Sequence, residues 1–263
     1  MIDTNKIQAA FFDIDGTLLS FASHSIPATA TEAVKHLREN GIKIFLATGR
    51  SVSNIGEAAL LPYDGVIAMN GTDITLKDGM RISHHAIPEN VFLRLLNRAE
   101  QYDVALAVEG DSGVFVNQMT ERVKEISRLV DVPVPPVREL RDIFIPEVTS
   151  QLCLFADTAT EKKIMSDFPG LTATRWCDIF ADINVAGIDK GTGVKEICDY
   201  YGIDLACTIA FGDGGNDIPM IKTAGIGVAM GGAAESVKIH ADYIAKTVDD
   251  DGIQSALKEL GII

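Results

Sequence analysis

Short apolar runs recur near both ends of the chain, and four of them end in polar residues. The runs are Ala9–Phe12, Ile42–Ala47, Gly65–Met69, Cys207–Phe211, Ile226–Ala229 and Tyr243–Ala245. Runs of this length without polar alternation are typical of strands that are buried on both faces of a parallel sheet. We therefore predict one parallel sheet assembled from both ends of the chain.

Helical patterns separate these runs. They lie at Thr29–Asn40, from Ser51 toward Leu60, from Gly187 to Tyr201, and at Asp217–Ala224. Gly41 can cap the first of these helices, and Pro219 is tolerated in the first turn of the last one. Strands that alternate with helices in this way predict an α/β domain with helices on the faces of its sheet.

The middle of the chain follows a different pattern. An Asp78-Gly79 turn between the alternating flanks of Ile74–Ile82 predicts a β-hairpin. Beyond it we expect helices near 89–102, 120–129 and 160–168, and strands near 104–108, 114–116, 151–155, 172–176 and 180–183. This irregular order predicts an α+β domain, residues 84–185, inserted into an α/β core domain of residues 1–83 and 186–263.

Composition and charge narrow the class of protein. The 263 residues are 47% hydrophobic and carry a formal net charge of −14, which argues against an extensive nucleic-acid surface. The four cysteines form no C-x-x-C pair and fit neither a zinc knuckle nor a disulfide framework. No secretory signal pattern follows Met1, and no apolar run approaches the roughly 18 residues of a membrane span. We expect a cytoplasmic protein without a membrane or nucleic-acid partner.

Polar residues that could carry chemistry follow the predicted strands. They are Asp13 and Asp15 after the first strand, Thr48 after the second, Asn70 after the third, and Asp213, Asn216 and Asp217 after the fourth. Parallel strands end at one edge of a sheet, where α/β proteins bind their ligands. Lys190, just ahead of a helix, is the only lysine beside these motifs. We therefore expect these residues to share one site.

The aspartates of this site need a positive partner. Several carboxylates within about 5 Å would repel one another by on the order of 3 kcal/mol per pair at an effective dielectric near 20. A divalent cation is the simplest compensation, and a few carboxylates that leave room for water and substrate favour Mg²⁺. An EF-hand does not fit, because Leu18 stands where its loop needs glycine.

A phosphate would bring these groups together. It can accept hydrogen bonds from the Thr48 hydroxyl and the Gly49 amide while Lys190 and the metal neutralise it. One aspartate could then attack phosphorus, and the second could donate a proton to the leaving oxygen. A dinucleotide-binding fingerprint does not fit, because Asp217 stands at its third glycine position, and no P-loop pattern occurs.

The motifs resemble those of a known family. Asp13-Ile14-Asp15-Gly16-Thr17, Thr48-Gly49-Arg50, Lys190-Gly191 and Gly212-Asp213-Gly214-Gly215-Asn216-Asp217 resemble, in order, the four motifs of the haloacid dehalogenase (HAD) superfamily. The similarity is closest to its Cof-type sugar-phosphate phosphatases and spans the chain from Phe11 onward. It implies a Rossmann-like parallel-sheet core and an α+β cap domain between the second and third motifs.

The resemblance also implies a role for each motif residue. Asp13 would be the nucleophile that forms an aspartyl-phosphate, and Asp15 the acid and base. Mg²⁺ would be held by the Asp13 carboxylate, the Asp15 backbone carbonyl and Asp213. Residues that would hold the phosphate are Thr48, Gly49, Lys190 and Asn216, and residues in supporting positions are Gly16, Thr17 and Asp217.

For the residues that could contact the substrate, the sequence leaves alternatives. Arg50 could pair with a substrate oxygen or with a structural carboxylate, and Asn70-Gly71 fits either a substrate contact or a plain turn. In the inserted domain the candidates for reading the substrate are Glu109, Arg175, Trp176 and Asp178, although packing or a solvated rim would also explain them.

We therefore expect a Mg²⁺-dependent phosphatase that acts on a small phosphorylated metabolite, a hexose or related sugar phosphate. Alternatives are a phosphomutase, which would use the same aspartyl-phosphate, and a metabolite-sensing module on an inactive scaffold. A dehalogenase is disfavoured because such family members lack the second aspartate, which is Asp15 here. Neither the sugar nor the oligomeric state follows from the sequence.

Overall fold

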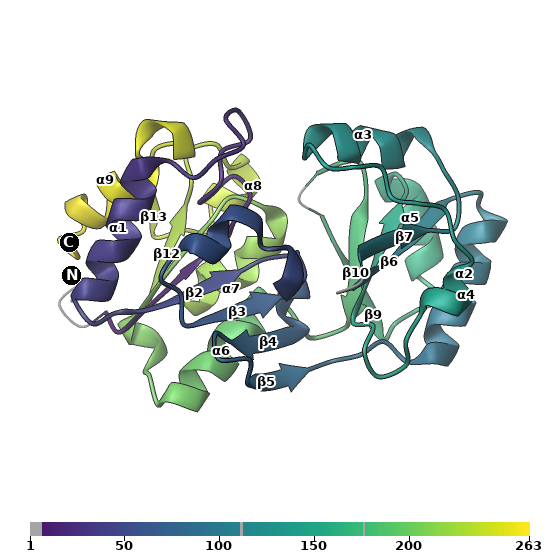
Figure 1. The fold of residues 1–263 in the computed structure, drawn as a ribbon, viewed down its shortest axis with the longest axis horizontal. Helices are drawn as coiled ribbons and strands as arrows, with labels where there is room; N and C mark the ends of the chain where they lie inside the picture. Colours follow the sequence, from purple (N-terminus) through teal and green to yellow (C-terminus); the bar gives the residue numbers. More distant parts are fainter. Residues whose placement is uncertain (1–6, 111–112, 176) are drawn as a thin grey trace. The chain divides into compact units, whose positions relative to one another are not determined.

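The computed structural model describes residues 7–110, 113–175 and 177–263. The chain forms two compact units, one within Met1–Ser83 and Asp189–Ile263 and the other within His84–Ile188 (Figure 1). Each unit has its own sheet and its own hydrophobic clusters.

The sheet of the first unit has the strand order β13-β12-β11-β1-β2-β3-β4-β5. Its strands are β1 (Ala9–Phe12), β2 (Lys43–Ala47), β3 (Gly65–Ala68), β4 (Asp73–Leu76), β5 (Arg81–His84), β11 (Thr208–Gly212), β12 (Ile226–Ala229) and β13 (Tyr243–Ile244). Neighbours from β13 to β3 pair in parallel, and β4 runs antiparallel to β3. The predicted parallel sheet is confirmed, and β1 lies in its middle.

Helices cover both faces of this sheet. The helices α1 (Ala28–Glu39) and α9 (Gly252–Glu259) cover one face (Figure 1). Phe12 points to this face, and its ring stacks on Phe211 with centroids 5.1 Å apart. Phe11 points to the opposite face, covered by α6 (Lys190–Tyr201) and α7 (Ile218–Thr223). Successive residues of β1 thus enter different cores, which explains why the strand is apolar throughout.

The structure confirms one of the predicted helix ends and contradicts one predicted helix. Gly41 adopts a left-handed φ of +80°, and the Gly41 and Ile42 amides donate to the Arg38 and Leu37 carbonyls, as the predicted cap requires. The predicted helix from Ser51 to Leu60 is wrong, since this segment forms two 3-10 turns, Val52–Asn54 and Gly56–Leu60. Gly56 has φ +58°, which interrupts a right-handed helix. A short helix, α8 (Glu235–Lys238), precedes β13.

The second unit has an antiparallel sheet with the order β7-β6-β8-β10-β9. Its strands are β6 (Ala105–Gly110), β7 (Gly113–Val116), β8 (Gln151–Phe155), β9 (Leu171–Thr174) and β10 (Ala181–Val185). Its helices are α2 (Glu89–Gln101), α3 (Glu121–Leu129), α4 (Leu140–Ile143) and α5 (Thr158–Met165). Residues of α2, α4 and α5 pack on one face and Val123 of α3 on the other. The predicted α+β character of this segment is confirmed, although α4 was not predicted.

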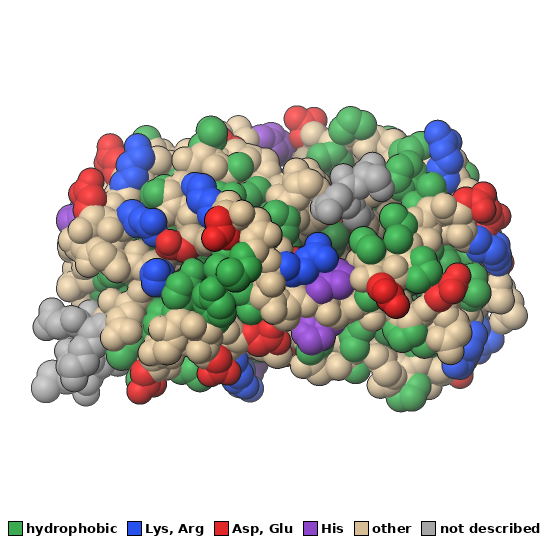
Figure 2. Space-filling model, turned by 60° about the horizontal axis from the view of Figure 1, so that its bottom comes forward, with side chains coloured by type: hydrophobic (Ala, Val, Ile, Leu, Met, Phe, Trp, Pro, Cys, Tyr) green, Lys and Arg blue, Asp and Glu red, His purple; other side chains and the backbone are tan. Residues whose placement is uncertain are grey.

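The surface carries charges of both signs. On the face drawn in Figure 2, Lys and Arg side chains are interspersed with Asp and Glu. Within the part of the chain that the structure describes, no helix has the length and apolar character that a membrane crossing requires.

Candidate active site

Asp13 follows β1 directly, and its side chain is almost fully buried. Lys190, the first residue of α6, is completely buried. Its Nζ donates hydrogen bonds of 2.6 Å to Asp13 Oδ1 and of 2.6 Å to Asp217 Oδ1. One lysine is therefore shared by two carboxylates that come from different strand ends.

The loop after β11 brings Asp213 to the same place. Asp217 Oδ2 accepts hydrogen bonds from the Asp213 and Gly214 amides at 3.0 and 2.8 Å, which folds this loop back on itself. Gly16 has φ +83°, and a Cβ atom on it would lie 2.3 Å from Asp213 Oδ2. Only glycine fits at this position, because any side chain would displace the Asp213 carboxylate.

The geometry of three carboxylates fits a metal ion. Among the described residues, Asp13, Asp213 and Asp217 each offer one carboxylate oxygen, and these oxygens lie within 4.8 Å of one another. Hard oxygen donors of this kind suit Mg²⁺. The Asp15 side chain does not belong to this group, so a metal contact from Asp15 would have to use its backbone carbonyl.

Burial and mutual repulsion perturb these carboxyl groups. Burial and the neighbouring Asp217 raise the pKa of Asp13 well above its usual range, although Lys190 opposes them. The same causes raise the pKa of Asp213 to about 7. Burial would lower the pKa of Lys190, but the charges of Asp13 and Asp217 outweigh it, and the pKa lies above its usual value. The negative charge of the site thus exceeds what one lysine can balance, which favours a cation.

Asp15 has a different partner. Arg50 Nε and Nη2 donate to the two Asp15 carboxylate oxygens at 2.8 and 2.6 Å, and both side chains are about one quarter exposed, 24% each. Arg50 Nη1 also donates to the Asn54 carbonyl at 3.2 Å. Arg50 could pair with a substrate oxygen or with a carboxylate of the protein, and in the structure it pairs with a carboxylate of the protein.

Thr48, Asn70 and Asn216 form the other side of the site. Thr48 is buried after β2, and its hydroxyl oxygen accepts the Arg50 amide at 3.0 Å, so its hydroxyl proton can still be donated. Asn216 Nδ2 donates to Asn70 Oδ1 at 2.9 Å, and both residues are buried. This contact joins the loops after β3 and β11, and no local sequence pattern predicts it.

The candidates in the second unit are held in other ways. Arg175 donates to Glu161 and to the Phe180 and Ala156 carbonyls at 3.0 and 2.7 Å, so its guanidinium holds the surrounding loop together. Glu109 Oε2 accepts from Gln151 Nε2 at 3.1 Å, and Asp178 is exposed. The remaining candidate, Trp176, lies outside the described residues.

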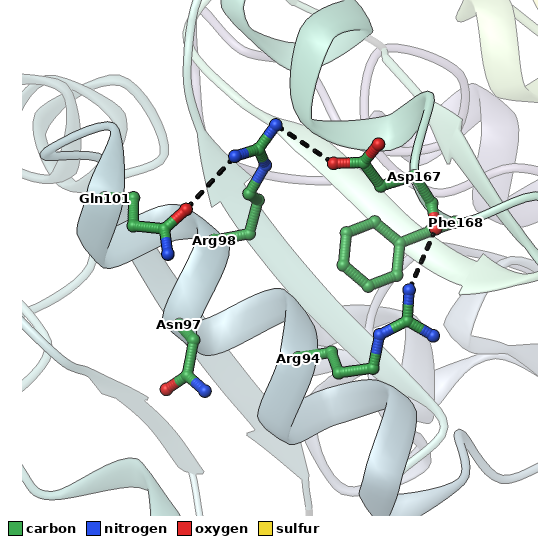
Figure 3. Close-up of a pocket in the computed structure, with 6 residues that line it drawn as sticks. All are labelled: Arg94, Asn97, Arg98, Gln101, Asp167 and Phe168. Atoms are coloured by element: carbon green, nitrogen blue, oxygen red, sulfur yellow. Dashed lines mark hydrogen bonds and ion pairs between the residues drawn. The ribbon is translucent and has the colours of Figure 1, made fainter.

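A surface hollow of about 370 Å³ lies in the second unit. Its lining residues are Arg94, Asn97, Arg98, Gln101, Asp167 and Phe168 (Figure 3). Arg98 pairs with Asp167 at 3.0 Å and donates to Gln101 at 3.1 Å. The hollow contains none of the predicted site residues, and the group of carboxylates described above lies in the other unit.

The comparisons with known proteins agree with this fold. The family model for haloacid dehalogenase-like hydrolases matches residues 10–257. The chain therefore belongs to this family. A protein of Bacillus subtilis (strain 168) with the provisional name phosphatase YkrA is 32% identical, over 96% of this chain and 97% of that protein.

Solved structures narrow the class further. BT1666 from Bacteroides thetaiotaomicron, described as a phosphatase of the HAD superfamily, is 45% identical with a TM-score of 0.94 over 99% of this chain and 97% of that one. The HAD subclass IIB sugar phosphatase BT4131 is 37% identical with a TM-score of 0.89, over 97% and 100% of the two chains. Together these similarities define the chain as a HAD phosphatase, a phosphoric monoester hydrolase.

Proposed function

We propose that this phosphatase hydrolyses a small phosphorylated metabolite, a hexose or related sugar phosphate, in a Mg²⁺-dependent reaction through an aspartyl-phosphate on Asp13. The observation that carries the proposal is the buried Asp13 carboxylate, 2.6 Å from Lys190 and grouped with Asp213 and Asp217. The similarity to a sugar phosphatase supports the substrate class.

In the first step, Asp13 attacks phosphorus and the bond between phosphorus and the ester oxygen breaks. Lys190 holds Asp13 Oδ1, which leaves the second oxygen of this carboxylate for the attack. Asp15 donates its proton to the departing oxygen. Both Asp15 oxygens accept hydrogen bonds from Arg50, so contact with the departing oxygen requires Asp15 to turn away from Arg50.

In the second step, water attacks the phosphorus of the aspartyl-phosphate. Asp15 accepts a proton from this water, the bond between phosphorus and Asp13 breaks, and inorganic phosphate leaves. Thr48, Gly49, Lys190 and Asn216 hold the phosphate oxygens by hydrogen bonds and charge throughout.

Asp13 and Asp213, with the Asp15 backbone carbonyl, would hold Mg²⁺, and Asp217 would support them through Lys190 and the loop amides. When bound, Mg²⁺ supplies positive charge that screens the phosphate from these carboxylates. The raised pKa values of Asp13 and Asp213 support this assignment, because they arise where negative charge is in excess.

Substrate choice is proposed to depend on the second unit. The Glu109 and Asp178 carboxylates can accept hydrogen bonds from sugar hydroxyls, which makes them the candidates that we retain. Arg175 is a weaker candidate, because its guanidinium already donates to Glu161 and to two carbonyls.

The test is release of inorganic phosphate from a panel of phosphorylated sugars, nucleotides and cofactors. We expect turnover of sugar phosphates, loss of turnover with EDTA, and recovery with Mg²⁺. Asp13→Asn should abolish turnover and leave the fold intact, as circular dichroism can check. Phosphate transfer to a second sugar without phosphate release would instead identify a mutase, and activity that is indifferent to chelation would remove the metal.

A further inference from the structure

The loop after β3, residues 69–72, contacts the other loops of the site and is called the β3 loop here. The Met69 amide donates to the Arg50 carbonyl at 3.1 Å, and the Asn70 amide donates to the Thr48 carbonyl at 3.0 Å. The β3 loop is thereby attached to the backbone of the Thr48-Gly49-Arg50 motif.

The same loop packs against the start of α6. Gly71 has φ +103°, and a Cβ atom on it would lie 2.2 Å from the Asp189 carbonyl oxygen. Asp189 caps α6, because its Oδ1 accepts the Thr192 amide at 2.8 Å, and the next residue is Lys190. This close approach packs the β3 loop against Asp189, the residue directly before the proposed phosphate-binding lysine, Lys190.

The backbone of the β3 loop is strained. Met69 and Asn70 have φ values of +48° and +55°, in the left-handed region that residues with a side chain rarely adopt. Such conformations persist only where surrounding contacts enforce them, and they concentrate at functional sites. A type I′ turn also has two successive residues with positive φ, but it favours asparagine and glycine there, so the left-handed φ of Met69 is the one that surrounding contacts must enforce.

The Asn70 side chain reaches the fourth motif. Its Oδ1 accepts from Asn216 Nδ2 at 2.9 Å, and Asn70 and Asn216 are 2% and 8% exposed. With one N–H of the Asn216 amide held by Asn70, the direction of its second N–H is set. A buried amide that is oriented in this way can donate to a phosphate oxygen without a loss of side-chain freedom on binding.

We propose that the β3 loop braces the phosphate-binding site and that Asn70 is a positioning residue, which orients the Asn216 amide toward the phosphate and does not itself contact substrate. This inference rests on the proposed function. It replaces the alternatives of a substrate contact or a plain turn at Asn70-Gly71, and it links the second, third and fourth motifs through one loop.

Asn70→Gly tests the proposal, because glycine adopts the left-handed conformation without strain and only the amide is lost. We expect kcat/KM to fall about tenfold and inhibition by inorganic phosphate to weaken by a similar factor, while the circular dichroism spectrum of the folded protein is retained. Asn70→Ser, a second variant, should show the same loss. Asn40→Ala is the matched control, since Asn40 is exposed on the C-terminal end of α1.

A double-mutant cycle separates an effect that acts through Asn216 from a general loss of order in the site. If Asn70 acts through Asn216, Asn70→Gly should change kcat/KM by less than about twofold in an Asn216→Ala background. Full activity of Asn70→Gly, or losses that add in the double variant, would overturn the proposal. If the wild type hydrolyses no phosphate ester, the proposed function fails instead, and calorimetry of inorganic phosphate binding by Asn70→Gly still tests the brace.

Discussion

Lys190 is the residue on which the charges of the site depend. It is completely buried and donates to Asp13 and Asp217, both of which are also buried. A buried ion pair contributes little by itself, but removal of one partner leaves a charge in the interior without compensation. The lysine is therefore needed for the fold of the site as well as for the phosphate binding proposed above.

Lys190→Met should destabilise the metal-free protein by about 3–5 kcal/mol, because two buried carboxylates lose their cation. Urea unfolding would measure this loss, and added Mg²⁺ should recover part of it. Lys35→Met, at an exposed position of α1, should change the free energy of unfolding by less than about 0.5 kcal/mol. Equal stability of the two variants would contradict the shared-lysine arrangement.

The effect of Asp15→Asn on the first step should depend on the leaving group. With a sugar phosphate, whose leaving oxygen needs a proton, the rate of aspartyl-phosphate formation should fall by about 10²- to 10⁴-fold. With p-nitrophenyl phosphate the loss should be smaller, because the nitrophenolate leaves without protonation. Single-turnover kinetics, which follow leaving-group release before the second step, would measure the difference, and an equal loss on both substrates would argue against Asp15 as the proton donor.

At the scale of elements, the site depends on the pairing of β1 with β11. These parallel neighbours have Phe12 beside Phe211 in register, so the loops that follow them leave the sheet side by side. The two loops approach so closely that Gly16 lies against the Asp213 carboxylate. The group of carboxylates is thus assembled by strand register together with one glycine.

Gly16→Ala should lower both stability and Mg²⁺ affinity, because the new methyl group meets Asp213 Oδ2. Gly79→Ala is a matched control, since Gly79 also has a left-handed φ, +89°, but has open space around its Cα. The control should lose about 1 kcal/mol of stability and no activity. Magnesium titration of activity compares the two, and equal Mg²⁺ dependence would contradict the close approach.

At the scale of the whole molecule, the hydrophobic clusters divide between the two units. The clusters around β1 and β2 draw all their buried residues from the first unit, and those around β6 and β8 draw theirs from 84–188. A segment with its own core and its own sheet meets the physical requirement for an independent domain.

The excised segment 84–188 should therefore fold alone. We expect one cooperative thermal transition, followed by circular dichroism, and dispersed amide signals in an NMR spectrum. Leu106→Ala, in the core of this segment, should lower its melting temperature, whereas Ile145→Ala, at an exposed position, should not. A fragment without a cooperative transition would show that its fold requires the rest of the chain.

Much of the fold could be predicted because the signals are local. Strands buried on both faces are apolar at every position, as in β1, and Gly41 marks the end of α1 through its own conformational freedom. The helix α9 was missed although Ile253, Ala256 and Leu257 are spaced for one helical face, because the segment is short and its packing against α1 is not local. The break at Gly56 was also unforeseen, since glycine is compatible with either handedness.

The same division applies to the site. The amino-acid pattern alone places polar residues after the ends of parallel strands, and hence at one edge of the sheet. It does not determine which of these side chains pair with one another. The pairs join residues far apart in the chain: Lys190 with Asp13 and Asp217, Asp15 with Arg50, and Asn216 with Asn70. Such contacts depend on side-chain direction and on distances of a few ångströms, which are set when strand register and helix packing bring separate loops together.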